Sequence, residues 1–228
     1  MSGRRHLVTG AGSGIGDRVA RRLHDRGDAL ILLARSPGRA EELAGEFPGA
    51  DVVVGDLADP SSLIGIAGAI TGPVDSLLHV AGVVELAEVA DVDLAGWQRQ
   101  LDVNLTSPAV LTRELLPLLR ASRGMVVFVN STAGFNANPS WAGYSASKFG
   151  LRALADALRA EERGNGVAVS TVFPSRTATP MQESVHAQEG RAYDPTEWSD
   201  ADTVAATIVH LLDLPTDSSI NEVTIRPR

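Results

Sequence analysis

Hydrophobic residues along most of the chain fall in short, nearly unbroken runs, and longer segments with helical spacing separate these runs. The run from Met125 to Val129 contains only apolar side chains. Unbroken apolar strands are typical of parallel sheets that are covered by helices on both faces. The alternation of strands and helices therefore predicts an α/β fold with right-handed crossovers.

The pattern predicts seven strands, at residues 7–9, 29–34, 51–54, 76–80, 125–130, 167–172 and 222–225. It predicts helices at residues 15–26, 38–47, 60–69, 94–119, 143–163 and 201–212. Residues 174–200 form the one long irregular stretch, and we expect a mobile loop there that covers the substrate and sets its choice. No linker or internal repeat divides the chain, so residues 1–228 are expected to form a single domain.

The composition of the chain excludes several classes of ligand and binding partner. The formal net charge is −8, and no long basic run is present, which argues against a nucleic-acid ligand. The chain has no cysteine, which excludes disulfides and thiolate chemistry, and its histidines lack metal-ligand spacing. The longest apolar run is too short to cross a membrane, and the N-terminal residues lead into a strand rather than a signal peptide. We expect a cytoplasmic protein with small-molecule ligands, no metal and no membrane partner.

A glycine-rich turn follows the first predicted strand, with the sequence Thr-Gly-Ala-Gly-Ser-Gly-Ile-Gly from Thr9 to Gly16. The dinucleotide fingerprint GxGxxG does not fit, because Ile15 stands where its third glycine would be; the spacing that fits is TGxxxGxG. A glycine turn before a helix brings backbone N–H groups close to a pyrophosphate. The alternative is a tight strand-to-helix turn with no ligand.

Lys148 is the only lysine of the chain, and it lies four residues after Tyr144. Residues with this spacing share one face of a helix. Lowering a phenol pKa from near 10 to about 7 takes roughly 4 kcal/mol, which a nearby ammonium group can supply. Such a tyrosine can exchange protons near neutral pH. The alternative is an exposed helix on which the two side chains are merely neighbours.

The glycine turn and the Tyr-Lys pair occur together with several further motifs in a fixed order. These are Asp56-Leu57, Ala81-Gly82, Asn104 and Ser131, which lies thirteen residues before Tyr144. In this order and spacing the chain resembles the short-chain dehydrogenase/reductase family from His6 to Thr179. The resemblance implies a Rossmann-like, doubly wound, seven-stranded parallel sheet with helices on both faces.

The resemblance also implies roles for four catalytic residues. Tyr144 would act as the general acid in reduction and as the base in oxidation, and Lys148 would lower its pKa and hold the nicotinamide ribose. Ser131 would bind the substrate carbonyl oxygen, and Asn104 would fix a water that links Lys148 to solvent. Taken alone, Ser131 could instead be a turn or capping residue, and Asn104 could cap or kink its helix.

The resemblance also implies residues that bind the cofactor. Asp56 would bind the adenine amino group, although it could instead only cap the following helix. Thr179 would bind the nicotinamide carboxamide. The full set is Gly10, Ser13, Gly14, Ile15, Gly16, Arg35, Asp56, Leu57, Ala81, Gly82, Tyr144, Lys148, Thr177 and Thr179. The second strand ends in Ala34-Arg35-Ser36, without the acidic residue that binds the ribose hydroxyls of NAD. Arg35, helped by Arg39, can pair with a 2′-phosphate, so NADP(H) is preferred and NAD(H) stays possible.

Two positions depart from the family pattern. The family's Asn-Asn-Ala-Gly is His79-Val80-Ala81-Gly82 in this chain, which predicts an altered tie between the central strands. Its Pro-Gly after strand six is Pro174-Ser175, which alters the backbone near the nicotinamide. Several side chains are candidates for the substrate pocket: Phe135, Trp141, Met181, His186 and Trp198.

The leading prediction is an NADP(H)-dependent oxidoreductase that interconverts a carbonyl and an alcohol. Two alternatives remain: a sugar-nucleotide epimerase or dehydratase that keeps a bound nicotinamide, and a non-catalytic sensor of dinucleotides. Similarity favours a homodimer or homotetramer packed through the helices that hold Asn104 and Tyr144.

Overall fold

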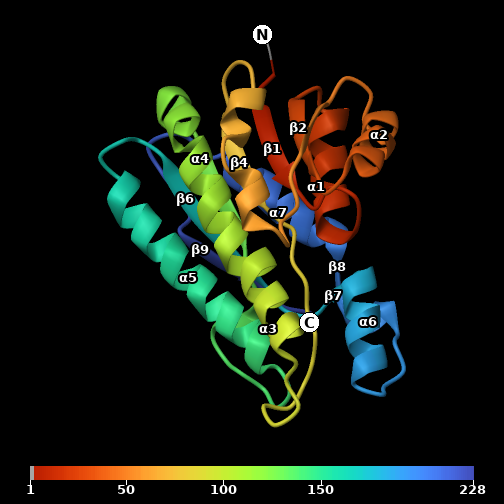
Figure 1. Ribbon diagram of the computed structural model, residues 1–228. Helices are drawn as coiled ribbons and strands as arrows, with labels where there is room; N and C mark the ends of the chain where they lie inside the picture. The colour runs from red at the N-terminus through yellow and green to blue at the C-terminus, as the bar shows by residue number, and fades with distance from the viewer. Residues whose placement is uncertain (1–2) are drawn as a thin grey trace.

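The computed structural model describes residues 3–228, and Met1 and Ser2 of the N-terminal segment lie outside the described residues. Seven parallel strands form the main sheet in the order β3-β2-β1-β4-β5-β6-β9 (Figure 1). The strands are β1 (Arg5–Thr9), β2 (Ala29–Ala34), β3 (Asp51–Val54), β4 (Ser76–His79), β5 (Met125–Val129), β6 (Ala168–Pro174) and β9 (Glu222–Ile225). The predicted doubly wound, Rossmann-like sheet is confirmed.

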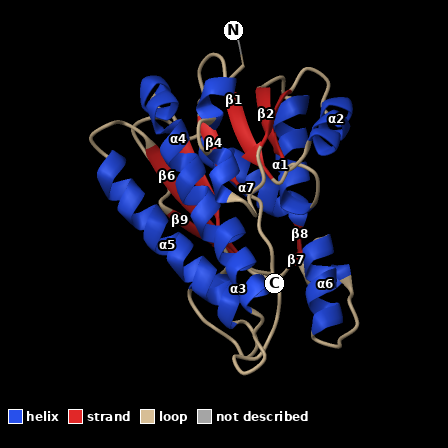
Figure 2. Ribbon diagram, viewed as in Figure 1, coloured by secondary structure: helices blue, strands red, loops and turns tan. Residues whose placement is uncertain are grey.

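Helices cover both faces of the sheet, and successive strand residues pack into different cores (Figure 2). Leu7 packs with residues of helices α4 and α5, whereas its neighbour Val8 packs with residues of α1, α2 and α7. This alternation explains the unbroken apolar runs, because both faces of each strand are buried. The helices are α1 (Gly14–Asp25), α2 (Pro37–Glu46), α4 (Ser107–Ser122), α5 (Ala142–Glu162) and α7 (Ala201–Leu212).

The predicted helix at residues 60–69 is wrong. Two short 3₁₀ helices, η1 (Pro60–Leu63) and η2 (Ile66–Ala69), occupy this segment. Gly65 lies between them with a φ of 80°, a left-handed conformation that interrupts an α-helix. The hydrophobic spacing nevertheless has a structural cause, because Leu63 and Ile66 are both buried in the core.

The predicted helix at residues 94–119 is continuous but contains an irregular turn. It consists of α3 (Leu94–Leu101), a π-helical turn η3 (Asp102–Thr106) and α4. The N–H of Ser107 donates to the carbonyl of Asp102, five residues earlier. Pro108 follows in the first turn of α4, and a proline has no N–H to donate to the carbonyl of Asn104. The backbone around Asn104 therefore departs from regular α-helical bonding.

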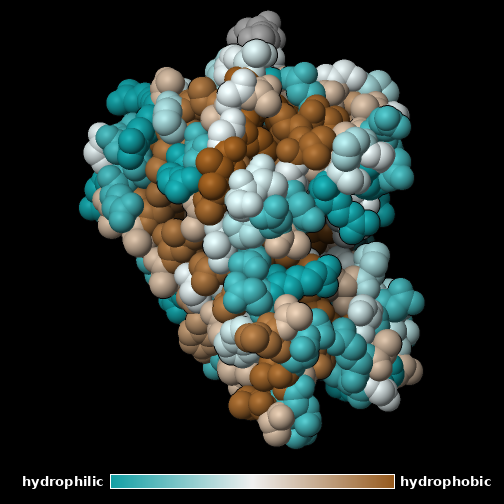
Figure 3. Space-filling model, viewed as in Figure 1, coloured by the Kyte–Doolittle hydropathy of each residue, from teal (hydrophilic) through white to brown (hydrophobic). Residues whose placement is uncertain are grey.

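Residues 174–200 are not the irregular loop that the sequence predicts. They contain β7 (Thr177–Ala178), α6 (Pro180–Gln188), η5 (Pro195–Glu197) and β8 (Ser199–Asp200). The strands β7 and β8 pair with each other in parallel, and the side chain of Thr179 caps α6. Figure 1 shows α6 at one end of the molecule, away from the helices that cover the sheet. In Figure 3 a notch separates this region from the part that holds α1 and α2.

The strand order reverses between β1 and β4, which are neighbours in the sheet although β2 and β3 come between them in the chain. Ligands of open α/β sheets bind in the crevice at the carboxyl ends of the strands at such a switch point. Thr9 ties the two strand ends together, because its hydroxyl accepts hydrogen bonds from the N–H groups of Val80 at 3.0 Å and Ala81 at 3.1 Å.

His79, one of the departures from the family pattern, lies at the end of β4 and is buried. Its Nε2 lies 2.8 Å from the hydroxyl of Thr112, and its ring stacks on Phe128 with 4.9 Å between centroids. Burial lowers the pKa of His79 to about 3, so the ring is neutral. His79 thus links β4 to α4 and packs against β5.

Within residues 3–228, no helix is both long enough and apolar enough to cross a bilayer. In the same part of the chain, no group of three or more histidine, aspartate or glutamate side chains is arranged to hold a metal ion.

Candidate active site

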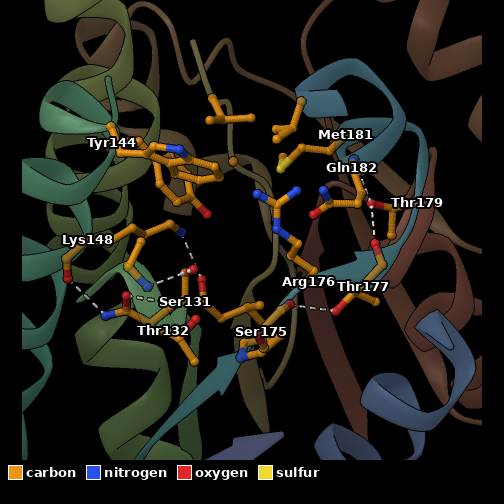
Figure 4. Close-up of a pocket in the computed structure, with 18 of the residues that line it drawn as sticks. Ser131, Thr132, Tyr144, Lys148, Ser175, Arg176, Thr177, Thr179, Met181 and Gln182 are labelled. Atoms are coloured by element: carbon orange, nitrogen blue, oxygen red, sulfur yellow. Dashed lines mark hydrogen bonds between the residues drawn. The ribbon is translucent and has the colours of Figure 1, made fainter. Parts of the chain in front are cut away.

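A cavity of about 640 Å³, here called the central cavity, opens at the carboxyl ends of β4, β5 and β6 (Figure 4). Side chains reach it from two sides. Ser131 lies just before the short 3₁₀ helix η4 (Thr132–Gly134), and Tyr144 and Lys148 lie on α5, whereas Arg176 and Met181 come from the segment after β6. The cavity lies where the strand order predicts a ligand crevice.

Tyr144 and Lys148 lie one turn apart on the buried face of α5, as their spacing predicts, and both line the central cavity. They are 7% and 3% exposed. The ammonium nitrogen of Lys148 lies 5.7 Å from the centre of the Tyr144 ring. It also donates a hydrogen bond to the carbonyl of Val129, the last residue of β5, at 3.1 Å.

Burial is the main cause of the pKa shifts of both Tyr144 and Lys148. It lowers the pKa of Lys148 from 10.5 to about 8, because a buried ammonium loses its hydration. It raises the pKa of Tyr144 above its usual value, and a hydrogen bond from Ser131 partly opposes this rise. The predicted fall of the Tyr144 pKa toward neutrality is therefore wrong for this structure, because the effect of burial exceeds the opposing effects.

Ser131 is a capping residue, as one alternative predicted, and it also lines the cavity. Its hydroxyl caps η4 (Thr132–Gly134) by accepting a hydrogen bond from the N–H of Ala133 at 3.1 Å. Its hydroxyl also acts to lower the pKa of Tyr144, against the effect of burial. The preceding residue, Asn130, donates from its side chain to the carbonyl of Lys148 at 3.0 Å. This bond fixes α5 against the end of β5.

Asn104 is buried beside the cavity but does not line it. Its side-chain amide donates to the carbonyl of Val83 at 2.9 Å and to the hydroxyl of Ser147 at 3.0 Å, and its oxygen accepts from the N–H of Val83 at 2.9 Å. The side chain therefore joins the loop after β4 to α5. A Cβ atom on Gly82 would lie 3.2 Å from the Asn104 oxygen and 3.7 Å from the Lys148 ammonium, so all three groups meet at one point.

The glycine turn is packed too tightly for side chains at two positions. A Cβ atom on Gly16 would lie 2.1 Å from the carbonyl oxygen of Gly10. Gly10 itself has a φ of 75°, and a Cβ there would lie 2.9 Å from the backbone of Ala81. Bare backbone therefore forms a cradle at the start of α1, of the kind that fits a pyrophosphate. Gly14 brings the turn within van der Waals reach of Thr179.

Some of the residues predicted to bind the cofactor lie outside the glycine turn, after strands β2 and β3. Arg35 is exposed at the end of β2, while Arg39 donates to the carbonyl of Gly12 at 3.2 Å. Asp56 accepts a hydrogen bond from the N–H of Ala58 at 2.9 Å, and the carbonyl of Leu57 accepts one from a serine of α4.

The structure thus gathers only part of the predicted set around the central cavity. The predicted residues that line it are Ile15, Gly82, Ser131, Tyr144, Lys148, Thr177 and Thr179. Those that lie outside its lining are Gly10, Ser13, Gly14, Gly16, Arg35, Asp56, Leu57, Ala81 and Asn104.

The pocket candidates divide in the same way. Trp141 and Met181 line the cavity, whereas Phe135, His186 and Trp198 do not. His186 is buried inside the α6 region, where Nδ1 lies 2.9 Å from the carbonyl of Gln182. It contacts the rings of Tyr193 and Trp198.

Arg176 and Asn130 line the cavity and were missed at the sequence level. The only signal for Arg176 was its place in the segment flagged as covering the substrate, two residues after Pro174. Ser175, the second departure from the family pattern, donates its N–H to the carbonyl of Ile225 at 2.8 Å, which fixes the backbone before Arg176.

Comparison with known proteins gives a consistent assignment. A family model described as short chain dehydrogenase matches residues 4–190. An uncharacterized oxidoreductase from Staphylococcus epidermidis is 30% identical over 226 residues, which cover 97% of this chain and 96% of that protein.

Two solved structures share the fold over almost their whole length. The alcohol dehydrogenase from the archaeon Thermococcus sibiricus, complexed with 5-hydroxy-NADP, has a TM-score of 0.86 and 25% identity, covering 98% of this chain and 96% of that chain. A protein described as an NAD(P)-dependent gluconate 5-dehydrogenase from Beutenbergia cavernae, with bound NADP, has a TM-score of 0.85 and 30% identity. The match covers 98% of this chain and 95% of that chain.

Proposed function

Because the chain belongs to the short-chain dehydrogenase family, we propose that this oxidoreductase uses NADP(H) to interconvert a carbonyl and an alcohol, with Tyr144 as the acid and base. The observation that carries the proposal is the meeting of Ser131, Tyr144 and Lys148 at one cavity beside the glycine turn. All three groups can donate hydrogen bonds, and none of the described residues that line the cavity is acidic.

The residues present fit a dinucleotide. The bare backbone at Gly10 and Gly16 would hold the pyrophosphate, and Thr179 lies beside this turn. Arg35 is exposed at the end of β2, where an enzyme selective for NAD would have an acidic residue. Both structural neighbours described above were solved with an NADP compound, which supports NADP(H) as the cofactor of this chain.

When bound, NADPH supplies the hydride, and the protein handles the oxygen and its proton. During reduction, negative charge develops on the substrate oxygen. The hydroxyls of Ser131 and Tyr144 would stabilise this charge more than they stabilise the neutral carbonyl. Burial raises the pKa of Tyr144, so its proton is present at neutral pH. Tyr144 would then give this proton to the oxygen, and the nearby ammonium of Lys148 would favour the resulting phenolate.

Proton resupply to Tyr144 would pass Lys148 and the backbone of Asn104. The side chain of Asn104 is already engaged with Val83 and Ser147. Its carbonyl, however, has no α-helical donor, because Pro108 occupies the position four residues later. We propose that this carbonyl, rather than the side chain, holds the water that the family resemblance predicts.

The proposal is tested with the purified full-length chain and a panel of aldehydes and ketones, by following NADPH consumption. We expect turnover with NADPH and at least a 100-fold loss in the Tyr144→Phe variant, which keeps the ring but loses the proton. The matched control is Tyr193→Phe, because Tyr193 is the only other tyrosine and does not line the cavity. Tight NADPH binding without turnover of any carbonyl compound would instead favour a dinucleotide sensor.

We further propose a homodimer or homotetramer packed through α4 and α5. Phe149 on α5 supports this, because its side chain is 44% exposed on the helix that carries Tyr144. Light scattering coupled to size exclusion tests the assembly, and a Phe149→Glu variant is expected to shift it toward the monomer.

A further inference from the structure

The central cavity is cationic although the protein as a whole is acidic. Lys148, Arg176 and Arg226 line it, and no aspartate or glutamate within residues 3–228 does. The formal net charge of the chain is −8, so this local excess of positive charge runs against the composition. A cavity lined by one sign of charge attracts ligands of the opposite sign. The pyrophosphate cradle lies at the glycine turn, so these arginines are available to another anionic group.

Arg176 is held in a fixed orientation at the wall of the cavity. Its guanidinium lies 5.8 Å from the ring of Trp141 and 5.4 Å from that of Trp198. One nitrogen, Nη2, donates to a carboxylate oxygen of Glu189 at 2.6 Å. Figure 4 shows the side chain extending into the cavity from the side opposite Tyr144 and Lys148.

The other terminal nitrogen of Arg176, Nη1, is buried and has no hydrogen-bond partner among the described residues. Glu189 thus engages only one nitrogen of the guanidinium, and a carboxylate is the group that the cavity-facing part of a guanidinium binds best. The second oxygen of Glu189 is also buried without a hydrogen bond. The hydrogen bond from Arg176 lowers the pKa of Glu189, so this carboxyl stays ionised at neutral pH and holds the guanidinium in place.

We propose that Arg176 is a specificity-determining residue that binds a carboxylate of the substrate, so that the substrates are oxo acids and the corresponding hydroxy acids. This inference rests on the proposed function. In reduction, the carbonyl carbon of the oxo acid gains a hydride from NADPH and its oxygen gains a proton from Tyr144, which leaves a hydroxy acid and NADP⁺. The carboxylate does not react; it stays paired with the guanidinium of Arg176 and directs the carbonyl toward Ser131 and Tyr144.

The first experiment compares substrates that differ only in charge. Short 2-oxo and 3-oxo acids are each paired with their methyl esters, and kcat/KM with NADPH is measured. The wild type should favour the best acid over its ester by about 30-fold or more, as expected for one charge-assisted hydrogen bond. Arg176→Met should remove this preference while leaving the ester rate within about threefold. Arg163→Met is the control, because Arg163 is exposed after the end of α5 and does not line the cavity.

Equal rates for acids and esters in the wild type would overturn the inference, as would an equal loss for both in Arg176→Met. A fall in NADPH affinity of Arg176→Met that accounts for the whole effect would assign the residue to the cofactor and also overturn it. A phosphorylated ketone that outperforms every oxo acid, and depends on Arg176, would identify a phosphate site instead and would likewise reject the carboxylate.

A binding measurement separates this inference from the proposed function. Titration of the NADP⁺-loaded protein with 2- and 3-hydroxy acids is followed by calorimetry, for the wild type and for Arg176→Met. Binding that depends on Arg176 without turnover of any substrate would support the carboxylate site and contradict the proposed reaction. Turnover of neutral ketones together with no acid binding would support the reaction and overturn the carboxylate site.

Discussion

The ammonium of Lys148 donates a hydrogen bond to the carbonyl of Val129 at the end of β5, 3.1 Å away. One of its three N–H donors is therefore bonded to the sheet. This bond fixes the ammonium at the cavity wall, so it does not extend toward solvent. Holding a charge in this position costs stability, since burial lowers the pKa of Lys148 to about 8. A buried ion retained at such a cost is a sign of function rather than of folding.

The first prediction concerns this cost. The pKa of Lys148 in the folded protein, about 8, lies below the value of 10.5 expected for the unfolded chain. Between these pH values the unfolded state binds more protons, so stability rises with pH. Lys148→Met should be more stable than the wild type at pH 7 and inactive. Its advantage should shrink by about 2 kcal/mol at pH 9.5, as measured by urea unfolding. An advantage that is independent of pH would contradict the assigned burial.

The second prediction concerns His79. Its pKa is about 3 in the folded protein and 6.5 in the unfolded chain, so the unfolded state alone gains a proton as the pH falls below 6.5. Stability should therefore fall by up to about 1.4 kcal/mol per pH unit from this group. His79→Asn, the residue the family usually has there, removes the titration. Between pH 6.5 and 5 the wild type should lose about 1.6 kcal/mol more than this variant in urea unfolding. Equal losses would show that His79 is already charged in the folded state.

The sheet could be predicted from the sequence because each strand is buried on both faces and therefore reads as an apolar run. The break at Gly65 could not, since hydrophobic spacing continues through it and only the backbone conformation changes. The regular structure in residues 174–200 could not be predicted either. The strands β7 and β8 pair although more than twenty residues separate them, and neither strand has a hydrophobic pattern of its own.

The candidate site shows the same division. Tyr144 and Lys148 could be predicted together because helix geometry alone fixes their relation. Arg176 could not, because its orientation depends on Glu189, thirteen residues later, and on two tryptophans from other segments. The side-chain bonds of Asn104 were likewise invisible, since they join a loop after β4 to α5.

The third prediction concerns the choice of cofactor. Arg35 is exposed at the end of β2, whereas Arg39 already forms ion pairs with Glu42 and Glu46. Substitution of Arg35 should therefore weaken binding of the 2′-phosphate more than substitution of Arg39 does. Arg35→Ser should raise KM for NADPH by about 10-fold or more and leave KM for NADH nearly unchanged. Arg39→Ser should give a smaller change. A parallel loss for both cofactors in Arg35→Ser would show that this residue does not read the phosphate.

The fourth prediction concerns the π-helical turn and the proton path. Pro108 leaves the carbonyl of Asn104 without its α-helical donor, and the N–H of Ser107 bonds Asp102 instead. Pro108→Ala supplies the missing N–H, so the turn can relax toward a regular α-helix and the carbonyl is occupied by the backbone. If that carbonyl holds the water that returns protons to Lys148 and Tyr144, kcat should fall by about 10-fold while KM stays unchanged.

The matched control for Pro108→Ala is Pro117→Ala, because Pro117 also lies within α4 but is exposed and far along the helix. Both substitutions should raise the free energy of unfolding, since each restores a helical hydrogen bond, but only Pro108→Ala should slow turnover. Imidazole added to the buffer should partly restore the rate of Pro108→Ala if proton return has become limiting, and the solvent deuterium isotope effect on kcat should rise. A slow variant that imidazole does not rescue would place the defect in the packing of α5 by Asn104. A variant with an unchanged rate would mean that protons reach Tyr144 by a path that avoids the π-helical turn.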